Sequence, residues 1–522
     1  VALINCLPKT AWPPTLLRGE IPLFTFAMGS RRLCCGSESL EDFFADETGE
    51  ESAGEKLSER NLRIQDNLIA VSMAGLRQDQ HTFINGYTDK NLWDYLQYRG
   101  EQAGALPLRD SDRDGKQVCR QAAGKLLRHI SENAFCAGQE PGWWSAEIQF
   151  REKVIWDVTE MPPYLYQGKA GISILLHQAL AQGILPDGEG AWLADRLDRE
   201  LFRCTDCLAE NGGPRVFGAM SGEYSLVYRY QYLYGLTGEE RYLDYAGRHL
   251  ALLDGKEPQE AFDLLAGLGG MAIVWLNQWQ LGGGQKCLET AGRMLDRLRA
   301  FVQKEAAQEY TEFLPGMAHG WSGLLMAFQR YASLTGSSRY EDAILLALKM
   351  ENDWYRPEFG NWEDIHRGEP MDTVAWCHGA AGILLCRMEL MESGCPEIAS
   401  IASRDAARAA EKIQSMPLRK GYCLCHGNLG NIAILKTYAQ PGRDAALKKR
   451  CTDYMREVAE QLMNDTLELL PQEAYDFGLM NGLGGIAAAL MDQGETVPDI
   501  MALRIPKKKA AAETAGGYEK LL

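Results

Sequence analysis

The sequence has no hydrophobic run that approaches the roughly 18–20 residues of a membrane-spanning helix, and its start shows no signal-peptide pattern. Positive charge is in deficit, since 54 Lys and Arg stand against 71 Asp and Glu and the formal net charge is −17 at pH 7. We therefore expect no membrane span, and neither nucleic acid nor an anionic membrane surface as the main partner. Alternation of apolar and polar residues is also scarce, so strands should be a minor element of an all-α protein.

The 14 cysteines are scattered through 522 residues rather than gathered in one short segment. This distribution argues against a small disulfide-stabilised scaffold and favours the reducing cytoplasm. Cys204 and Cys207 form a Cys-x-x-Cys pair, but no second Cys or His pair follows at ligand spacing, so we interpret the pair as structural. Cys386, Cys395 and Cys451 have the pattern of ordinary core residues.

A Gly-x-x-Gly motif followed by an apolar run recurs at intervals of about fifty residues. Copies occupy residues 168–171, 267–270, 320–323, 379–382, 427–430 and 482–485, and a degenerate copy at 219–222 fills the remaining gap. Each unit is typical of a helix pair, with Leu-Thr-Gly at 236–238 and 334–336 ending a helix. Seven such units predict a repeat architecture, and the glycines favour a closed ring with seven helix N-termini on one face.

The residues just before each glycine pair should occupy equivalent positions of this ring. These residues are Ala318-His319, Cys377-His378, Cys425-His426 and Met480-Asn481. Cys377, Cys425 and His426 together form a Cys₂His set that suits zinc and leaves a fourth position open, as in catalytic sites. His319 and His378 would lie nearby with side chains suited to proton transfer. Asp263, four residues before Gly267, either faces the same end of the ring as these residues or is an ordinary solvated or capping carboxylate.

Three motifs in a fixed order carry a family resemblance: Ala-His-Gly in the fourth unit, Trp-Cys-x-Gly in the fifth and Cys-His-Gly in the sixth. Over residues 115–505 the chain resembles the lanthipeptide cyclases, or LanC-like proteins. The resemblance implies an α/α toroid of seven inner and seven outer helices with one zinc ion. It also implies that Cys377, Cys425 and His426 bind the zinc, that His319 is catalytic and that Asp263 is its partner.

The implied reaction joins a cysteine thiol of a dehydrated, ribosomally made precursor peptide to a dehydroalanine or dehydrobutyrine. The product is a lanthionine or methyllanthionine ring. Two departures from the stand-alone cyclases, Thr373 in place of Arg and His378 in place of Tyr, favour the cyclase domain of the class II bifunctional synthetases (LanM type). The role that the missing arginine would fill stays open.

Residues 16–24 resemble the end of the dehydratase domain of those synthetases, and residues 57–73 resemble the helix that follows it. We therefore expect residues 1–110 to be a dehydratase remnant and linker, residues 115–505 the cyclase domain, and residues 506–522 a mobile tail. The chain would then be part of a longer synthetase, with the rest of the dehydratase domain on the same parent chain.

Two other functions stay open at this point. One is a LanC-like enzyme that adds glutathione or another small thiol to dehydro residues, and residues 16–73 count against it. The other is a non-catalytic α/α barrel that binds peptides. Such a barrel would be expected to lose a zinc ligand or His319, and the sequence has all four residues.

Overall fold

The computed structural model of the chain describes residues 115–506, apart from short gaps, and three short strands before residue 41. The gaps are residues 138–139, 151–153, 186–187, 213–215, 259, 309–310, 366–369, 417, 419–420, 440–443, 468, 470–472 and 474–475. Most of the predicted dehydratase remnant, residues 1–110, and all but the first residue of the predicted tail, residues 506–522, lie outside the described residues. No described helix combines the length and the apolar character that crossing a membrane requires.

The chain divides into two compact units. Unit 1 comprises Val1–Glu200, Pro417–Leu429 and Thr452–Gln493, and unit 2 comprises Leu201–Met416, Gly430–Cys451 and Gly494–Leu522. Three helices contribute residues to both units: α7 (Glu189–Asn211), α16 (Asn428–Tyr438) and α17 (Ala445–Met463).

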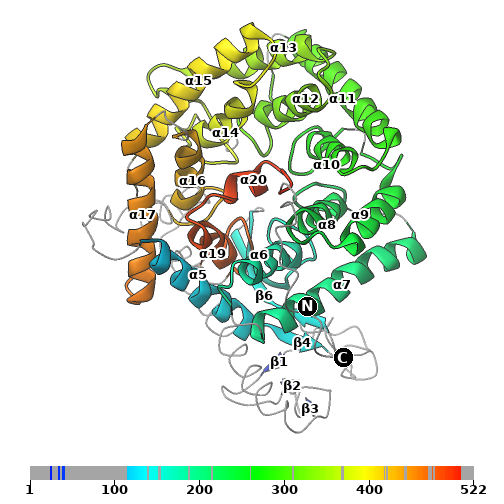
Figure 1. Cartoon of the computed structure of the whole chain (residues 1–522), viewed down its shortest axis with the longest axis vertical. Coiled ribbons are helices and arrows are strands. Elements are labelled where there is room, and N and C mark those ends of the chain that lie inside the picture. The colour runs from blue at the N-terminus through cyan, green and yellow to red at the C-terminus, as the bar shows by residue number, and fades with distance from the viewer. Residues whose placement is uncertain are drawn as a thin grey trace, which may run out of the picture. The chain divides into compact units, whose positions relative to one another are not determined.

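In unit 2 the helices form two layers (Figure 1). The inner layer consists of α8 (Glu223–Thr237), α10 (Leu268–Gln280), α12 (Trp321–Thr335) and α14 (Ala380–Leu390). The outer layer consists of α9 (Glu240–Leu253), α11 (Gln285–Ala306), α13 (Glu341–Asn352) and α15 (Pro396–Ser415), and the short α20 (Val497–Met501) follows near the end of the chain. Each inner helix packs against the outer helix that follows it, as the repeat predicts.

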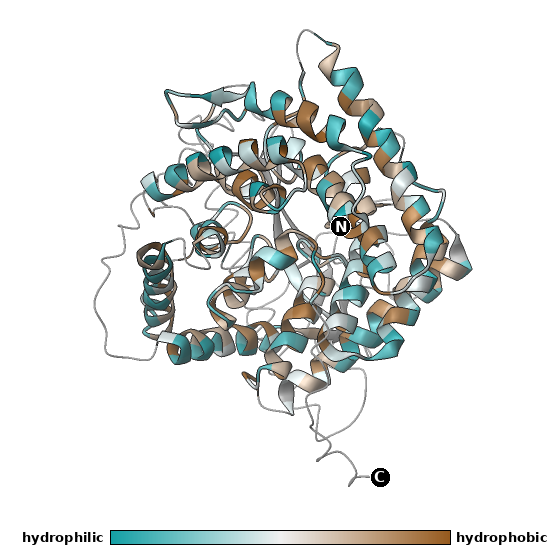
Figure 2. Cartoon of the chain, turned by 45° about the horizontal axis from the view of Figure 1, so that its top comes forward, coloured by the Kyte–Doolittle hydropathy of each residue, from teal (hydrophilic) through white to brown (hydrophobic). Residues whose placement is uncertain are grey.

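The sequence pattern explains which helix is inside. Helix α10 is buried continuously from Leu268 to Gln278, whereas α11 buries one face that includes Leu295 and Leu298. The outer helices accordingly mix hydrophilic and hydrophobic residues along their length (Figure 2). Gly238 and Gly336 end α8 and α12 with φ of 76° and 68°, a left-handed conformation that glycine adopts without strain, as predicted.

Unit 1 contains α5 (Gly115–Glu132), α6 (Lys169–Ala181) and α19 (Leu483–Met491). Helix α19 begins at the seventh glycine motif, but its partner is α5, which precedes the first motif. The seventh helix pair is therefore completed by the first helix of the described helical region. The sequence predicts a first helix of the toroid near residues 125–130, and α5 covers that stretch.

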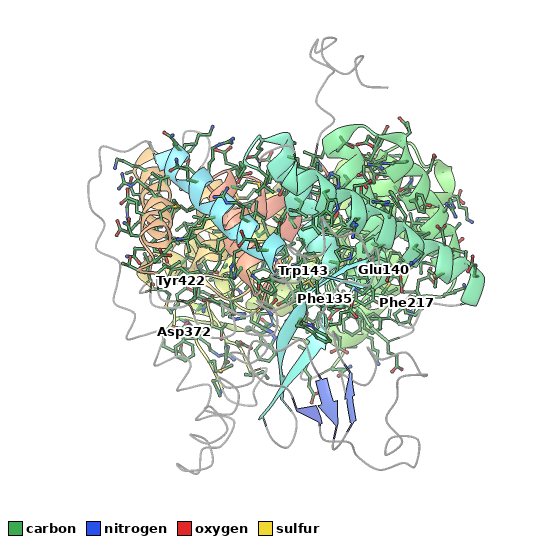
Figure 3. All side chains as sticks on the ribbon, turned by 90° about the horizontal axis from the view of Figure 1, so that it is seen from below. Phe135, Glu140, Trp143, Phe217, Asp372 and Tyr422 are labelled. Carbon is green, nitrogen blue, oxygen red and sulfur yellow. The ribbon has the colours of Figure 1, made fainter. Side chains whose placement is uncertain are left out.

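Short strands accompany the helices. Unit 1 holds the sheet β1-β2-β3 (Phe24–Thr25, Leu33–Cys35, Glu38–Leu40) and the antiparallel pairs β4–β5 (Phe135–Ala137, Glu140–Gly142) and β6–β7 (Trp144–Phe150, Val154–Glu160). The β6–β7 hairpin, in register from Trp144↔Glu160 to Phe150↔Val154, projects from the helices of unit 1 (Figure 3). Unit 2 holds the pair β8–β9 (Tyr355–Arg356, Asn361–Trp362).

The structure corrects the register of the second repeat. Helix α8 begins after Gly222, whereas the predicted copy at residues 219–222 placed Ala219 in that position. A Cβ on Gly222 would lie 2.2 Å from the carbonyl oxygen of Phe217, and a Cβ on Gly168, which precedes α6, would lie 2.2 Å from that of Pro162. Gly222 is therefore the first glycine of its motif, and Ser225 stands where the other units have their second.

The segment that follows α20 is bound to the inner helices of unit 2. Arg330 donates hydrogen bonds to the carbonyl of Ala502 and to the carboxylate of Glu389, at 3.2 Å and 2.7 Å. Arg504 binds the same carboxylate oxygen at 2.9 Å. Glu389 thus ties the inner helices α12 and α14 to the segment that follows α20.

Candidate active site

A backbone ladder joins equivalent loops in unit 2. In three successive repeats, the residue two positions before the helix-starting glycine donates its N–H to the carbonyl of the equivalent residue in the next repeat. The bonds run from Met220 to Leu265 (3.1 Å), from Leu265 to Ala318 (3.1 Å) and from Ala318 to Cys377 (3.3 Å). The same positions of successive repeats are thus direct neighbours, and they carry the residues that the sequence singled out.

Unit 1 has the same ladder. The N–H of Cys425 donates to the carbonyl of Met480 at 2.9 Å, and the N–H of Met480 donates to the carbonyl of Tyr166 at 2.9 Å. Cys425 therefore occupies in unit 1 the position that Cys377 occupies in unit 2. His426 and Asn481 follow these positions, as predicted from the repeat.

Asp263 and His319 form a hydrogen-bonded pair. His319 Nδ1 lies 2.7 Å from Asp263 Oδ2, and the imidazole is 46% exposed while the carboxylate is 16% exposed. The other oxygen, Asp263 Oδ1, accepts the N–H of Ala266 at 2.8 Å, so both carboxylate oxygens are held. Because Nδ1 is bound to the carboxylate, Nε2 is the ring nitrogen that is left for proton exchange. The N–H of Ala266 lies before α10, whose N-cap Gly267 has no side-chain cap hydrogen bond, so Asp263 closes the turn that leads into the helix and does not cap it.

A buried carboxylate binds main-chain N–H groups of the loop that carries His319. Glu351, on α13, accepts the N–H of Gly316 at 3.0 Å and the N–H of Ser322 at 3.1 Å. Arg387 pairs with the same carboxylate at 2.8 Å, and both side chains are fully buried. Sequence reasoning missed Glu351, because one acidic residue on an outer helix has the appearance of a solvated side chain.

His378 lies beside His319 but is mostly buried. The two ring centroids are 6.0 Å apart at an interplanar angle of 30°. His378 Nδ1 lies 3.8 Å from Oδ1 of the buried Asp364. The structure therefore gathers Asp263, His319, Cys377 and His378 in unit 2, with Asp364 as a carboxylate that sequence reasoning missed. No motif marks Asp364, which is held by an isolated β-bridge to Met371.

The Cys425–His426 loop of unit 1 is supported in a similar way. The buried Glu473 accepts the N–H groups of Tyr422 and Cys423, at 2.5 Å and 2.8 Å. Cys425 is 3% exposed, and His426 is partly exposed. The loop is too tight for a side chain at Gly427, because a Cβ there would lie 2.3 Å from the backbone nitrogen of Cys423.

The proposed zinc ligands are divided between the units, with Cys377 in unit 2 and Cys425 and His426 in unit 1. Within the described part of the chain, no three His, Cys, Asp or Glu side chains form a group that could hold a metal ion. The donor types nevertheless fit zinc, because neither cysteine forms a disulfide among the described residues and both lie at the same ladder position beside an inner helix.

Cys386 and Cys451 are buried core residues, as predicted, whereas the prediction is wrong for Cys395, which is half-buried at the N-cap of α15. Burial raises the pKa of the Cys386 and Cys451 thiols to about 12, so both stay protonated and unreactive at neutral pH. Cys377 and Cys425 differ from them in lying on loops rather than inside helices.

Comparisons with known proteins agree with the sequence motifs. The family described as lanthionine synthetase C-like protein matches residues 159–500. The lacticin 481/lactococcin biosynthesis protein LcnDR2 of Lactococcus lactis subsp. lactis is 22% identical over 388 residues, which cover 71% of this chain and 40% of that protein. Glutathione S-transferase LANCL1 of Danio rerio is 29% identical over 145 residues, which cover 25% of this chain and 33% of that protein.

Among solved structures, nisin cyclase matches with a TM-score of 0.50 and 16% sequence identity, over 65% of this chain and 91% of that one. The fold class predicted from the sequence, an α/α toroid, is confirmed by this likeness. The chain spans about two fifths or less of the length of the two curated relatives.

Proposed function

This chain belongs to the lanthionine synthetase C-like family, and we propose that it is a lanthipeptide cyclase. It adds cysteine thiols of a dehydrated precursor peptide to dehydroalanine or dehydrobutyrine residues of the same peptide, which gives thioether rings. We further propose that it is the cyclase part of a bifunctional synthetase, and the likeness to the Lactococcus lactis protein supports this. A cytoplasmic setting is part of the proposal, because substrate thiols and thiolate ligands have to stay reduced.

The observation that carries the proposal is the Asp263–His319 pair. His319 directly follows Ala318, whose N–H binds the carbonyl of Cys377 in the ladder. Asp263 holds Nδ1 of His319 at 2.7 Å, which fixes the ring and leaves Nε2 as the atom that exchanges a proton. The imidazole is nearly half exposed, so a bound peptide can reach it. A pair used only for packing would be expected to bury the histidine.

The reaction needs little more than a positioned proton carrier. The S–H bond of the peptide cysteine breaks, an S–C bond forms at the β-carbon of the dehydro residue, and the C=C π-electrons pass to an enolate. A proton then adds at Cα, so atoms and electrons balance without an oxidant or co-reactant. His319 Nε2 takes the thiol proton or delivers the proton to Cα.

Cys377, Cys425 and His426 would hold the zinc ion that we propose as cofactor. When bound, zinc lowers the pKa of a thiol so that the thiolate forms at neutral pH. The chain's contribution is to hold the two cysteines and the histidine on supported loops. His378, buried beside Cys377, would orient this loop or assist proton transfer.

The direct test is cyclisation of a pre-dehydrated precursor peptide, read out by thiol capping and mass spectrometry. We expect rings with the full chain, a loss of about 100-fold or more in rate for His319→Ala, and zinc loss in Cys377→Ala and Cys425→Ala. Rings formed at an undiminished rate by His319→Ala, or full zinc retention in both cysteine variants, would contradict the proposed site.

Addition of a small thiol is the second candidate, favoured by the likeness over 145 residues to the protein named glutathione S-transferase. The same assay separates the two functions when glutathione is present. Ring closure leaves the peptide mass unchanged and protects its cysteine from capping. Glutathione addition raises the mass by one glutathione and leaves the cysteine open to capping.

A further inference from the structure

The loop that carries Cys377 is closed at its base by one buried amide. Asn361, in β9, is fully buried, and its Nδ2 donates to Asp372 Oδ1 and to the carbonyl of Thr373, both at 2.8 Å. Its Oδ1 is buried without a hydrogen-bond partner among the described residues. The side chain therefore acts through its two donor contacts, and it keeps them although its acceptor is left unsatisfied.

The cysteine loop, residues 373–379, begins and ends at this amide. Val374 and Gly379 form a β-bridge, and a Cβ on Gly379 would lie 1.8 Å from the carbonyl oxygen of Thr373. Gly379 adopts a φ of 83°, which only glycine tolerates easily, and the same Cβ would lie 3.7 Å from Asn361 Nδ2. Cys377 sits inside this closed loop, so the position of its base sets the position of the sulfur.

Asn361 is not the sole support of the loop. Asn431, from α16, donates to the carbonyl of Val374 at 3.0 Å. Lys412 binds Asp372 Oδ2 at 2.5 Å, so the aspartate stays anchored without Asn361. Loss of the Asn361 amide should therefore release the Thr373 carbonyl and let the loop shift, rather than unfold it.

We propose that Asn361 is a positioning residue for Cys377. It fixes the first residue of the cysteine loop through the main-chain carbonyl of Thr373, and so holds the thiol where a metal can bind it. The inference rests on the proposed function, because it concerns the proposed zinc ligand. The role does not depend on the side chain of Thr373, which is the position where stand-alone cyclases have arginine.

The test measures the zinc affinity of the full chain by chelator competition, with the metal alone as probe, alongside thermal unfolding of the zinc-free protein. Asn361→Ala removes both donor contacts. Asn361→Asp keeps the shape and replaces the donor by an acceptor, and it serves if the alanine variant does not fold. Asn352→Ala is the matched control, because Asn352 accepts from Trp362 and donates to Asp405 in the same region without contacting the cysteine loop.

We expect zinc affinity to fall about 10- to 100-fold in the Asn361 variants and to stay unchanged in Asn352→Ala, even where the melting temperatures fall equally. Wild-type affinity in both Asn361 variants would overturn the inference while leaving the proposed function intact. Absence of zinc from the wild-type chain itself would overturn both.

Discussion

At Gly316 the backbone of the His319 loop packs closely against the Cys377 loop. It has a φ of 114°, and a Cβ on it would lie 2.7 Å from the carbonyl oxygen of Cys377 and 2.9 Å from Cα of His378. Gly316→Ala therefore inserts one methyl group between two loops that carry proposed site residues. It alters none of their side chains.

The size of the effect follows from these distances. Ordinary contact begins at 3.4 Å, so the Cys377 carbonyl has to move by about 0.7 Å. That shift would stretch the bond from the Ala318 N–H, which is 3.3 Å already, to about 4 Å. The positive φ at residue 316 also costs the alanine variant about 1–3 kcal/mol of stability through backbone strain. Misplacement of a reacting group by about 1 Å can reduce a rate about 100-fold, so we expect a 10- to 100-fold loss in cyclisation.

The assay is the rate of ring formation on a pre-dehydrated peptide, with the melting temperature measured in parallel. Gly336→Ala is the matched control, since Gly336 ends the same helix α12 with a φ of 68°, and a Cβ on it would have no other described heavy atom within 4 Å. Gly336→Ala should lower the melting temperature without slowing ring formation. Equal rates for the two variants would refute the claim that loop spacing at Gly316 controls activity.

Three further changes test other parts of the structure. Asp263→Asn removes the carboxylate from its histidine partner and should slow cyclisation about 100-fold with little change in melting temperature; a rate within threefold of wild type would contradict the pairing. Burial raises the pKa of Glu389, but the guanidinium groups of Arg330 and Arg504 outweigh this effect and hold the pKa below its ordinary value. The stabilisation that Glu389 contributes is therefore present above the unfolded-state pKa and is lost as the pH falls through the folded-state pKa. Glu389→Gln should therefore cost about 3–5 kcal/mol at neutral pH and flatten the acid limb of a pH-dependent denaturation series. Gly222→Ala should prevent or strongly weaken folding, because its Cβ would lie 2.2 Å from a backbone oxygen, and a soluble variant with a wild-type melting temperature would contradict the corrected register.

The inner helices could be predicted because their start is a local feature. The first glycine of each motif lies against backbone atoms only a few residues earlier in the chain, so a short window of sequence is enough to show that a side chain has no room there. The second repeat is misleading because Ser225 replaces the second glycine. The surviving Gly222 then has the appearance of the second member of its pair, which puts the predicted copy three residues out of register.

The supports of the site could not be predicted in the same way. Helix α5 pairs with α19 across the whole domain, and its amphipathic pattern indicates a helix without naming its partner. Glu351 and Glu473 act on loops 29 to 51 residues away along the chain. Their sequence surroundings do not distinguish them from solvated acids.

The ladder explains how one repeated backbone can carry different chemistry. Leu265, Ala318, Cys377 and Cys425, each two positions before the glycine, all form ladder hydrogen bonds through main-chain atoms, so these bonds do not depend on the side chain at that position. Each loop with a proposed site residue is then held by its own buried polar group: Glu351 under the His319 loop, Asn361 under the Cys377 loop and Glu473 under the Cys425 loop. Since these groups bind main-chain atoms, they fix the loops whatever side chains the loops present. We therefore expect substitutions of these three loop-holding residues to reduce cyclase activity as readily as substitutions of the reacting groups.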